Sequence, residues 1–179
     1  FFRKFNKKII MFVDEPYLGC FGSAYTPINR EDVVKGLKEL TESIKSKEVL
    51  TGVHCCGNTD WSIFTDVESI DIINFDAFSF LDKLVLYADN LKEFLKRGGI
   101  LCWGIVPTQE FTDKDTAGLL IKKINDGIDI LVKKGLDKDL LLDRLLLSPA
   151  CGLGTLDARK SEEIFKLLLE VSLSIRKIP

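Results

Sequence analysis

The chain contains a single histidine, His54, in the run from Gly52 to Gly57, where an apolar stretch gives way to a loop. Side chains alternate between the two faces of an extended strand, so we expect His54 and Cys56 on one face and Cys55 on the other. An imidazole and a thiolate two residues apart can bind one metal ion. A mixed nitrogen and sulfur set suits zinc better than magnesium or calcium, so the pair predicts part of a zinc site.

A further soft donor lies far downstream at Cys151, within the segment 148–153, where another short apolar run ends in a loop with glycine and proline. Taken alone, Cys151 is better explained as a core residue, because free cysteine often behaves as a small hydrophobic side chain. The spacing also differs from that of zinc fingers, whose ligands come in short paired modules. The equivalent position of both segments, each at the end of a strand-like run, favours a shared metal site.

Stretches of strand character alternate along the chain with stretches of helical periodicity. Short apolar runs predict strands at residues 8–13, 49–56, 70–75, 100–106 and 145–147. Apolar residues at helical spacing predict helices at residues 29–47, 80–96, 113–134 and 161–177, with a short amphipathic segment at 61–67. Asn29 is the expected cap of the first helix. Strands separated by helices favour a parallel sheet with right-handed crossovers.

Residues capable of chemistry follow the predicted strands. They are Asp14, His54, Cys56, Asp76, Thr108 and Cys151. The carboxyl ends of parallel strands form one edge of the sheet, and active sites of parallel α/β folds are built at that edge. This coincidence is the strongest argument from the residues alone for a functional site.

The whole chain, residues 1–179, is predicted to form a single α/β domain of about five β-α units. An eight-stranded barrel usually takes about 250 residues, so five units do not close one. We therefore expect the C-terminal portion of a (β/α)₈ TIM-type barrel that lacks its first three units. A complete doubly wound domain is the alternative, although no Gly-x-Gly-x-x-Gly loop follows the first strand.

The composition is that of an ordinary soluble globular protein, with 46% hydrophobic residues, 29% charged residues and a net charge of -2. No basic face for nucleic acid is indicated, no apolar run is long enough to span a membrane, and no signal-peptide pattern opens the chain. Five cysteines, an odd number with two adjacent, do not suggest a disulfide framework. This pattern favours a reducing cytoplasm.

Four motifs carry a resemblance to a known family. Asp14-Glu15-Pro16, His54-x-Cys56, Asp76 and the segment 148–153 occur in the order seen in the catalytic domain of cobalamin-independent methionine synthase, which the chain resembles over essentially its whole length. Methylcobalamin:coenzyme M methyltransferases and uroporphyrinogen decarboxylase belong to the wider superfamily. The resemblance implies Zn²⁺ bound by His54, Cys56 and Cys151, with Asp76 as a weaker fourth ligand or neighbour. It also implies that Asp14 holds the amino group of the substrate.

The chain departs from the family pattern at three places. Asp76 stands where the family typically has the longer Glu, and Ala150 replaces a carboxylate beside the cysteine. The segment 104–109 has no counterpart of the Asp-Ile-His sequence whose histidine is thought to protonate the departing folate. A positioned acid typically contributes about 10²- to 10⁴-fold to such a step, whereas cobalt leaves as Co(I) without a proton. The pattern therefore favours a methylcorrinoid, such as methylcobalamin, over methyltetrahydrofolate as methyl donor.

The function predicted from these features is a zinc-dependent methyltransferase that activates a homocysteine-like thiol. Its expected partners are a small-molecule thiol acceptor and a corrinoid protein, with neither nucleic acid nor membrane. Two alternatives stay open. One is a uroporphyrinogen decarboxylase-like enzyme without zinc, and the other is a non-catalytic half-barrel. A half-barrel exposes sheet edges and apolar faces, so we expect it to associate with itself or with another chain.

Overall fold

The computed structural model describes residues 8–22 and 27–175. Its strands are β1 (Ile9–Asp14), β2 (Val49–Cys55), β3 (Ile72–Phe75), β4 (Ile100–Val106) and β5 (Leu145–Pro149). They form one sheet in the order β1-β2-β3-β4-β5, and every neighbouring pair is parallel. All five carboxyl ends therefore lie at one edge. The predicted α/β class is confirmed, and the open parallel sheet is consistent with part of a TIM-type barrel.

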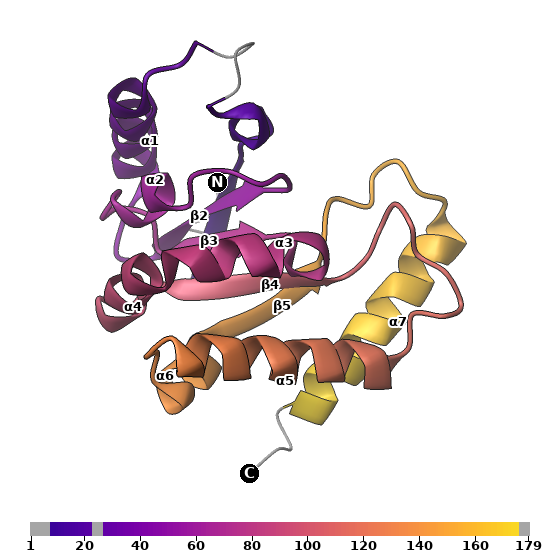
Figure 1. The fold of residues 1–179 in the computed structure, drawn as a ribbon. Coiled ribbons are helices and arrows are strands. Elements are labelled where there is room, and N and C mark those ends of the chain that lie inside the picture. Colours follow the sequence, from indigo (N-terminus) through magenta and orange to yellow (C-terminus); the bar gives the residue numbers. More distant parts are fainter. Residues whose placement is uncertain (1–7, 23–26, 176–179) are drawn as a thin grey trace.

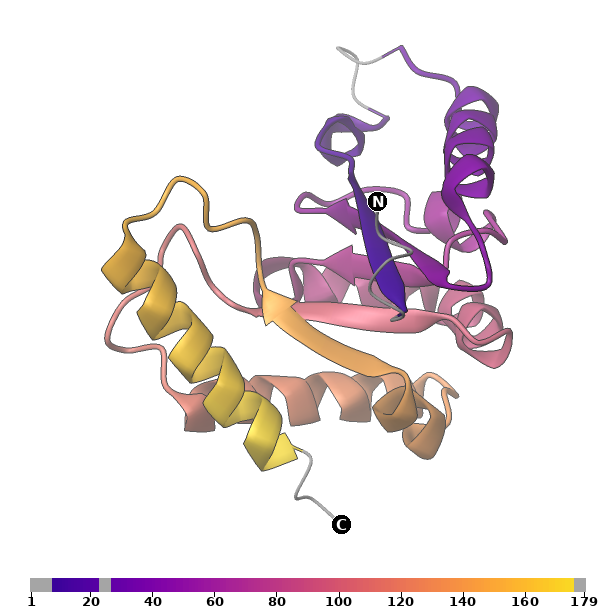
Figure 2. The ribbon, with the colours of Figure 1, turned by 180° about the vertical axis from the view of Figure 1, so that it is seen from behind.

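Helices connect the strands and cover one side of the sheet (Figure 1). They are α1 (Arg30–Ile44), α2 (Ser62–Thr65), α3 (Ala77–Leu84), α4 (Ala88–Lys96), α5 (Ala117–Lys133), α6 (Lys138–Asp143) and α7 (Ala158–Ile175), with 3₁₀ turns η2 (Tyr17–Cys20) and η3 (Val85–Tyr87). Figure 2 looks onto the other face, where β1, β4 and β5 lie uncovered by any described helix. None of the helices in the described part of the chain has the length and apolarity needed to cross a bilayer.

The alternation of side chains divides the sheet into a packed face and an open face. Phe75 and Trp103 are buried on the helix side, with ring centroids 6.0 Å apart at an edge-to-face angle of 68°. On the opposite face Ile10 is 48% and Phe12 is 42% exposed. Gly52 of the neighbouring strand leaves the space that the Phe12 ring occupies. The side of the sheet that carries His54 is thus the open one, because His54 is the register partner of Asp14, two residues beyond Phe12.

The helix boundaries differ from the predicted ones where a capping side chain intervenes. Asn29 is the predicted cap of α1, and its side chain accepts a hydrogen bond from the Glu31 amide. The predicted helix 80–96 is instead α3, η3 and α4, because the Asp76 side chain caps a helix that begins at Ala77. Apolar periodicity does not reveal such a break when both pieces pack the same way against the sheet.

Capping side chains also explain why α5 begins later than predicted and why α6 forms although it was not predicted. The helix predicted at 113–134 begins only at Ala117, because the Thr116 side chain accepts from the Leu119 amide and caps it there. Helix α6 was not predicted, and the Asp137 side chain caps it by accepting from the Leu140 amide. The last predicted helix begins three residues early, at Ala158, and its positions 176 and 177 lie outside the described residues.

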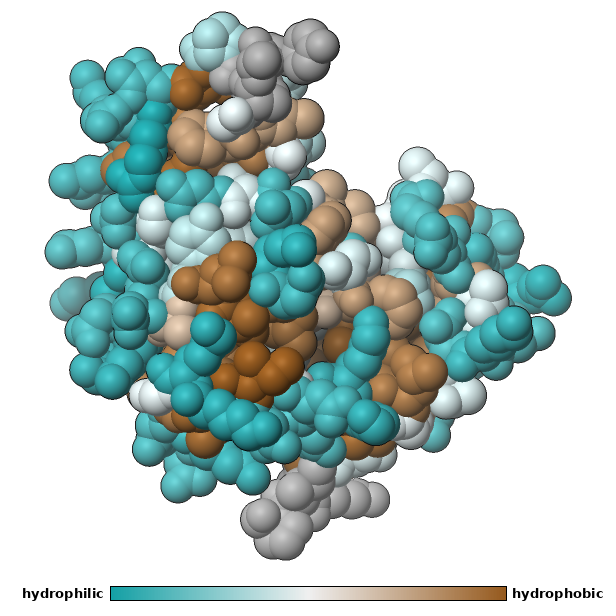
Figure 3. All heavy atoms as spheres, in the orientation of Figure 1, coloured by the Kyte–Doolittle hydropathy of each residue, from teal (hydrophilic) through white to brown (hydrophobic). Residues whose placement is uncertain are grey.

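The outer surface of the helices keeps some apolar side chains. Figure 3 shows them in brown over α3 and α5, between the teal charged side chains. On the helices and turns of the described chain, Leu86 of η3 is 70% exposed and Ile130 of α5 is 41% exposed. Scattered exposed apolar residues of this kind are normal for a soluble domain and indicate no site by themselves.

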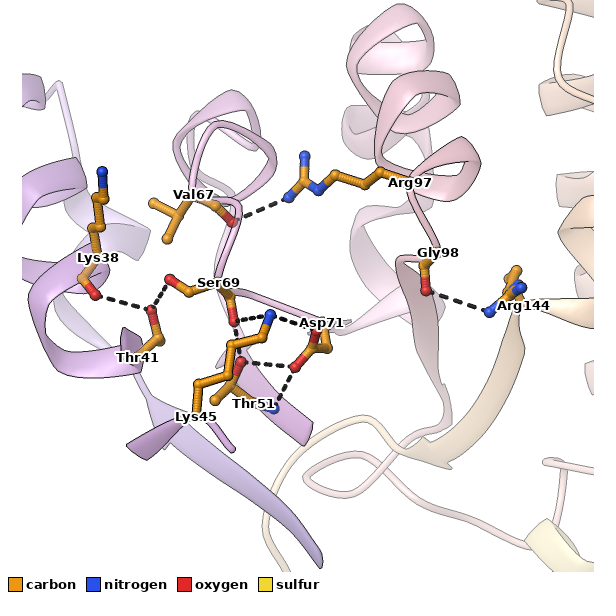
Figure 4. A network of polar contacts seen from close by, with 10 residues as sticks. All are labelled: Lys38, Thr41, Lys45, Thr51, Val67, Ser69, Asp71, Arg97, Gly98 and Arg144. Atoms are coloured by element: carbon orange, nitrogen blue, oxygen red, sulfur yellow. Dashed lines mark hydrogen bonds and ion pairs between the residues drawn. The ribbon is translucent and has the colours of Figure 1, made fainter. Parts of the chain in front are cut away.

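The amino-terminal edge of the sheet is held by a polar network around Asp71, which lies just before β3 (Figure 4). The amide of Thr51 donates to Asp71 Oδ2 at 2.9 Å, and its hydroxyl lies 3.1 Å from the same oxygen. Lys45 Nζ is 2.9 Å from Asp71 Oδ1. Networks at this edge of parallel α/β folds serve stability, whereas function is placed at the opposite edge.

Asp71→Ala is expected to lower the free energy of unfolding by about 1 to 3 kcal/mol, because the part-buried Thr51 amide loses its acceptor. The half-exposed ion pair with Lys45 adds little, since surface pairs contribute about 0 to 1 kcal/mol. Urea denaturation measures the change. The change should not reach the metal site predicted at the other edge. An unchanged free energy of unfolding would show that the network is dispensable.

Candidate metal centre

Three side chains that can bind metal converge at the carboxyl edge of the sheet. The ligand atoms of His54, Cys56 and Cys151 all lie within 4.8 Å of one another. Atoms bound to one zinc ion at about 2.0 to 2.3 Å are at most about 4.6 Å apart, so small side-chain rotations would suffice to close on an ion. Among the residues that the structure describes, this is the one group of three histidine, cysteine or acidic side chains with such spacing.

The three residues come from strands that are not neighbours. His54 is the penultimate residue of β2, Cys56 follows that strand, and Cys151 is the second residue after β5. Because β3 and β4 lie between them, the two loops must bend toward each other over the sheet. Backbone contacts permit this bend: a Cβ on Gly104 would lie only 2.7 Å from the Ala150 Cα, next to Cys151.

Gly104→Ala is expected to push away the loop that carries Cys151. Overpacking at such a contact costs about 1 to 3 kcal/mol of stability. Zinc affinity should fall by at least about tenfold, which is the low end of the effect of disturbing ligand support in metal sites. Isothermal titration with zinc measures the affinity, and thermal unfolding measures the stability.

Gly36→Ala in α1 is the matched control, because a Cβ there meets no atom within 4 Å. A glycine in a helix interior costs about 0.5 to 1 kcal/mol relative to alanine, so this variant should be more stable and bind zinc as the parent does. Equal zinc affinity of the Gly104→Ala and parent proteins would show that the close contact between Gly104 and Ala150 is not needed to position Cys151.

Asn74 fixes the orientation of the His54 ring. Asn74 is the register partner of both His54 and Cys102 on the same face of the sheet. Its Nδ2 donates to the Cys102 carbonyl oxygen at 2.9 Å and to Ser148 Oγ at 2.8 Å. A carbonyl oxygen only accepts, so Nδ2 must face Cys102 and Oδ1 must face His54, whose Nδ1 lies 2.6 Å away. His54 Nδ1 therefore carries the proton and donates to Asn74.

The other ring nitrogen of His54 is free to bind a metal ion. His54 Nε2 is buried and has no hydrogen-bond partner in the protein. Leaving a buried polar atom unsatisfied costs about 1 to 3 kcal/mol. A neutral imidazole with its proton held on Nδ1 by a fixed oxygen is the usual form of a metal-binding histidine. The residues present therefore fit a bound zinc ion.

Four of the five cysteines form two pairs, one at the cluster (Cys56 and Cys151) and one buried in the packing (Cys55 and Cys102). Burial, the charge of Cys151 and the hydrogen bond between the two thiols raise the pKa of Cys56. Without a cation the Cys56 thiol therefore keeps its proton more readily, and a metal ion would reverse this by binding the thiolate. Burial raises the pKa of Cys55 to about 11, and its side chain is 1% exposed, which confirms that it points away from the cluster. Cys102 is likewise buried, and its pKa is raised by burial.

A cavity of about 380 Å³ adjoins the cluster, with both Cys56 and Cys151 in its wall. Asp76 and the buried Thr108 also line it. Asp76 is not one of the three converging side chains, and its Oδ1 accepts from the Ser79 amide at 2.9 Å as the cap of α3. Asp76 nevertheless lies close enough to Cys56 for its negative charge to contribute to the raised pKa of that thiol. Direct ligation by Asp76 stays a prediction.

Asp14 is placed beside the cluster on the neighbouring strand. It ends β1 as the register partner of His54, so both side chains emerge on the same face. It is exposed, and it does not line the cavity that contains the two cysteines. Its role toward a substrate stays a prediction.

Sequence reasoning overlooked Asn74, the residue that orients the histidine. A signal was present, because asparagine is depleted in strands and Asn74 interrupts an otherwise apolar run, Ile72–Phe75. The two tryptophans are packing residues, since Trp61 and Trp103 are 0% and 1% exposed.

Comparison with known proteins gives a likeness in structure only. No family model matches the chain, and neither does any curated protein. The chain is similar to a solved structure from Listeria monocytogenes that carries the provisional description of a vitamin-B12 independent methionine synthase, with a TM-score of 0.55 and 22% sequence identity. The match covers 94% of this chain and 48% of that one, so the chain spans about half the length of its structural relative. The likeness shows that this chain shares the α/β fold found in that part of a methionine synthase-like protein.

Proposed function

We propose that the chain binds one Zn²⁺ through His54, Cys56 and Cys151 and activates a small-molecule thiol for methylation. The observation that carries the proposal is the convergence of two thiols and a partnerless imidazole nitrogen at the carboxyl edge of the sheet. The structural likeness to a protein described as a methionine synthase supports the same reading at the level of fold. Three protein donors are typical of catalytic zinc sites, which keep one position for a substrate or water.

The chemistry that zinc supplies when bound is the deprotonation of a coordinating thiol, which otherwise has a pKa near 8.5 and is mostly protonated at neutral pH. The chain's own residues do the positioning. Asn74 holds the His54 ring, and Phe78, Phe80 and Pro107 give the cavity beside the cysteines an apolar wall. Alignment of two reacting groups in such a site lowers a barrier by several kcal/mol, on the order of 7 or more in the best cases.

The methyl donor that we favour is a methylated corrinoid, free or carried by a corrinoid protein, over methyltetrahydrofolate. Loss of a folate nitrogen requires a proton, and a positioned acid typically contributes about 10²- to 10⁴-fold. The single imidazole of the chain is committed to the cluster, with Nδ1 bonded to Asn74. Co(I) departs without a proton, so a corrinoid reaction needs no such acid.

The test combines metal analysis with a methyl-transfer assay. Zinc-loaded protein is supplied with a homocysteine-like thiol and either methylcobalamin or methyltetrahydrofolate, and the methylated thiol is quantified. The proposal expects one zinc per chain and faster turnover with methylcobalamin. Equal or faster turnover with methyltetrahydrofolate would overturn the choice of donor. Absence of bound zinc, combined with decarboxylation of a porphyrinogen, would favour a zinc-free decarboxylase instead.

Asp14→Asn is expected to weaken binding of an amino-bearing thiol by about tenfold while leaving the zinc content unchanged, because an amide lacks the charge that attracts an ammonium group. The position of Asp14 beside His54 in the sheet register motivates this expectation. The KM for the thiol and elemental analysis are the two readouts. Loss of zinc in the variant would assign Asp14 to the metal site instead.

A further inference from the structure

Two of the five cysteines are placed to react with each other. The sulfur atoms of Cys56 and Cys151 lie within 4.8 Å of one another, and Cys151 is close enough to raise the pKa of the Cys56 thiol. A disulfide needs its two sulfur atoms about 2.05 Å apart. Both residues lie in loops beyond their strands, so side-chain rotations and a small loop movement can join the sulfurs without disturbing the sheet.

A small oxidant has access to both sulfurs. Cys56 is exposed, Cys151 is half-buried, and both line the cavity of about 380 Å³. Thiols that are oxidised reversibly are accessible and lie next to a second thiol, and this pair meets both conditions. The raised pKa of Cys56 lowers its thiolate fraction, but the thiolate that does form is a stronger nucleophile.

The other three cysteines are poorly placed to compete. Cys55 and Cys102 are 1% and 6% exposed, and burial raises the pKa of both thiols. Cys55 follows His54 in the strand and points to the face opposite Cys56. Cys20 is exposed in η2, outside the converging group. The turn that carries Cys20 does contact the loop after β2, so Cys20 is the competitor that the experiment must exclude.

We propose that Cys56 and Cys151 form a redox pair: in the metal-free protein a hydroperoxide joins them in a disulfide, which withholds both sulfurs from zinc until a small thiol reduces it. One thiolate attacks a peroxide oxygen, the O–O bond breaks, and a sulfenic acid forms as hydroxide leaves. The second thiolate attacks the sulfenic sulfur, the S–S bond forms, and a second hydroxide leaves. The two hydroxides take up the two thiol protons, so one hydrogen peroxide becomes two waters. In the reverse direction two molecules of the reducing thiol return the electrons and become a disulfide.

The disulfide and the zinc ion compete for the same two sulfurs. A cysteine binds zinc as a thiolate, and a disulfide has no thiolate, so the oxidised protein keeps only His54 of the three converging donors. Bound zinc in turn occupies both thiolates and protects them from the oxidant. This competition rests on the proposed function, whereas the formation of the disulfide in metal-free protein does not.

The disulfide is tested on metal-free protein treated with hydrogen peroxide. A thiol count in denaturant should show the loss of two of the five thiols, and dithiothreitol should restore them. Peptide mass spectrometry should find the tryptic peptide of Cys56 joined to that of Cys151. A full count of thiols after treatment, or a bridge to Cys20 in place of Cys151, would overturn the proposal.

Variants identify which sulfur of the adjacent pair is bonded, because Cys55 and Cys56 lie in one tryptic peptide. Cys56→Ser, an exposed change, should abolish the bridge to Cys151. Cys55→Ala, the matched control on the opposite face of the strand, should keep it, and so should the surface change Cys20→Ser. A bridge to Cys151 that persists in Cys56→Ser would contradict the assignment.

A second measurement tests the competition with zinc and separates it from the proposed function. With free zinc at ten times its Kd about one site in eleven is empty, so the bridge should form about tenfold more slowly. Oxidised protein should bind no zinc, and dithiothreitol should restore binding. An unchanged rate in protein that holds zinc, or equal zinc binding by oxidised protein, would refute the inference. Failure of the reduced protein to bind zinc would refute the proposed function alone, because the bridge is measured without metal.

Discussion

Cys151→Ser is expected to reduce zinc affinity by at least about 10²-fold. Disturbing the support of a metal ligand already costs about 10- to 100-fold, and this change removes a ligand that converges with His54 and Cys56. A serine hydroxyl has nearly the same size but is not deprotonated at neutral pH, so the fold should persist while the negative charge is lost. Competition with a chromogenic chelator gives the affinity, and elemental analysis gives the stoichiometry.

Cys20→Ser is the matched control for this variant. Cys20 is exposed in η2 and is not part of the cluster, so its replacement should leave both zinc affinity and stoichiometry unchanged. Near-identical circular dichroism of the two variants would exclude misfolding as the cause of a difference. Parent-like zinc binding by Cys151→Ser would remove that residue from the site and leave only a pair of ligands.

The sequence predicted the architecture because its signals are local. Apolar runs such as Ile100–Val106 are strands in the structure, and they have the predicted bounds where glycine or proline marks the ends. Parallel pairing follows from their alternation with helices. The common face of His54 and Cys56 follows from strand alternation alone. The proximity of His54 and Cys56 to Cys151 was inferred from topology, because the carboxyl ends of all parallel strands lie at one edge of the sheet.

Two features of the candidate site could not be predicted from the sequence. One depends on the register in which the strands pair, and the other on which of two possible roles a carboxylate takes. Asn74 becomes important only because strand pairing sets it between His54 and Cys102, and no local pattern fixes that register. Asp76 illustrates the competition. An acidic residue between a strand and a helix can be a metal ligand or a helix cap, and here one carboxylate oxygen serves as the cap of α3.

Asn74→Leu is expected to lower zinc affinity by about 10- to 100-fold although Asn74 does not belong to the converging group, since loss of an oriented partner has this effect on histidine ligands. Without the Oδ1 acceptor, the proton of the imidazole is no longer confined to Nδ1. Only the tautomer with an unprotonated Nε2 presents the lone pair that the cluster needs. The chain has one histidine, so the ¹⁵N spectrum of metal-free protein reports that ring alone.

Asn74→Asp separates orientation of the ring from general stability. A carboxylate still accepts from His54 Nδ1, but it cannot donate to the Cys102 carbonyl or to Ser148 Oγ. Zinc affinity and the single-tautomer ¹⁵N spectrum should therefore recover, whereas the free energy of unfolding should fall by about 1 to 3 kcal/mol. If affinity fell in both variants in proportion to stability, Asn74 would be a structural residue only. Recovery of affinity in the less stable variant is the outcome that only an orienting role explains.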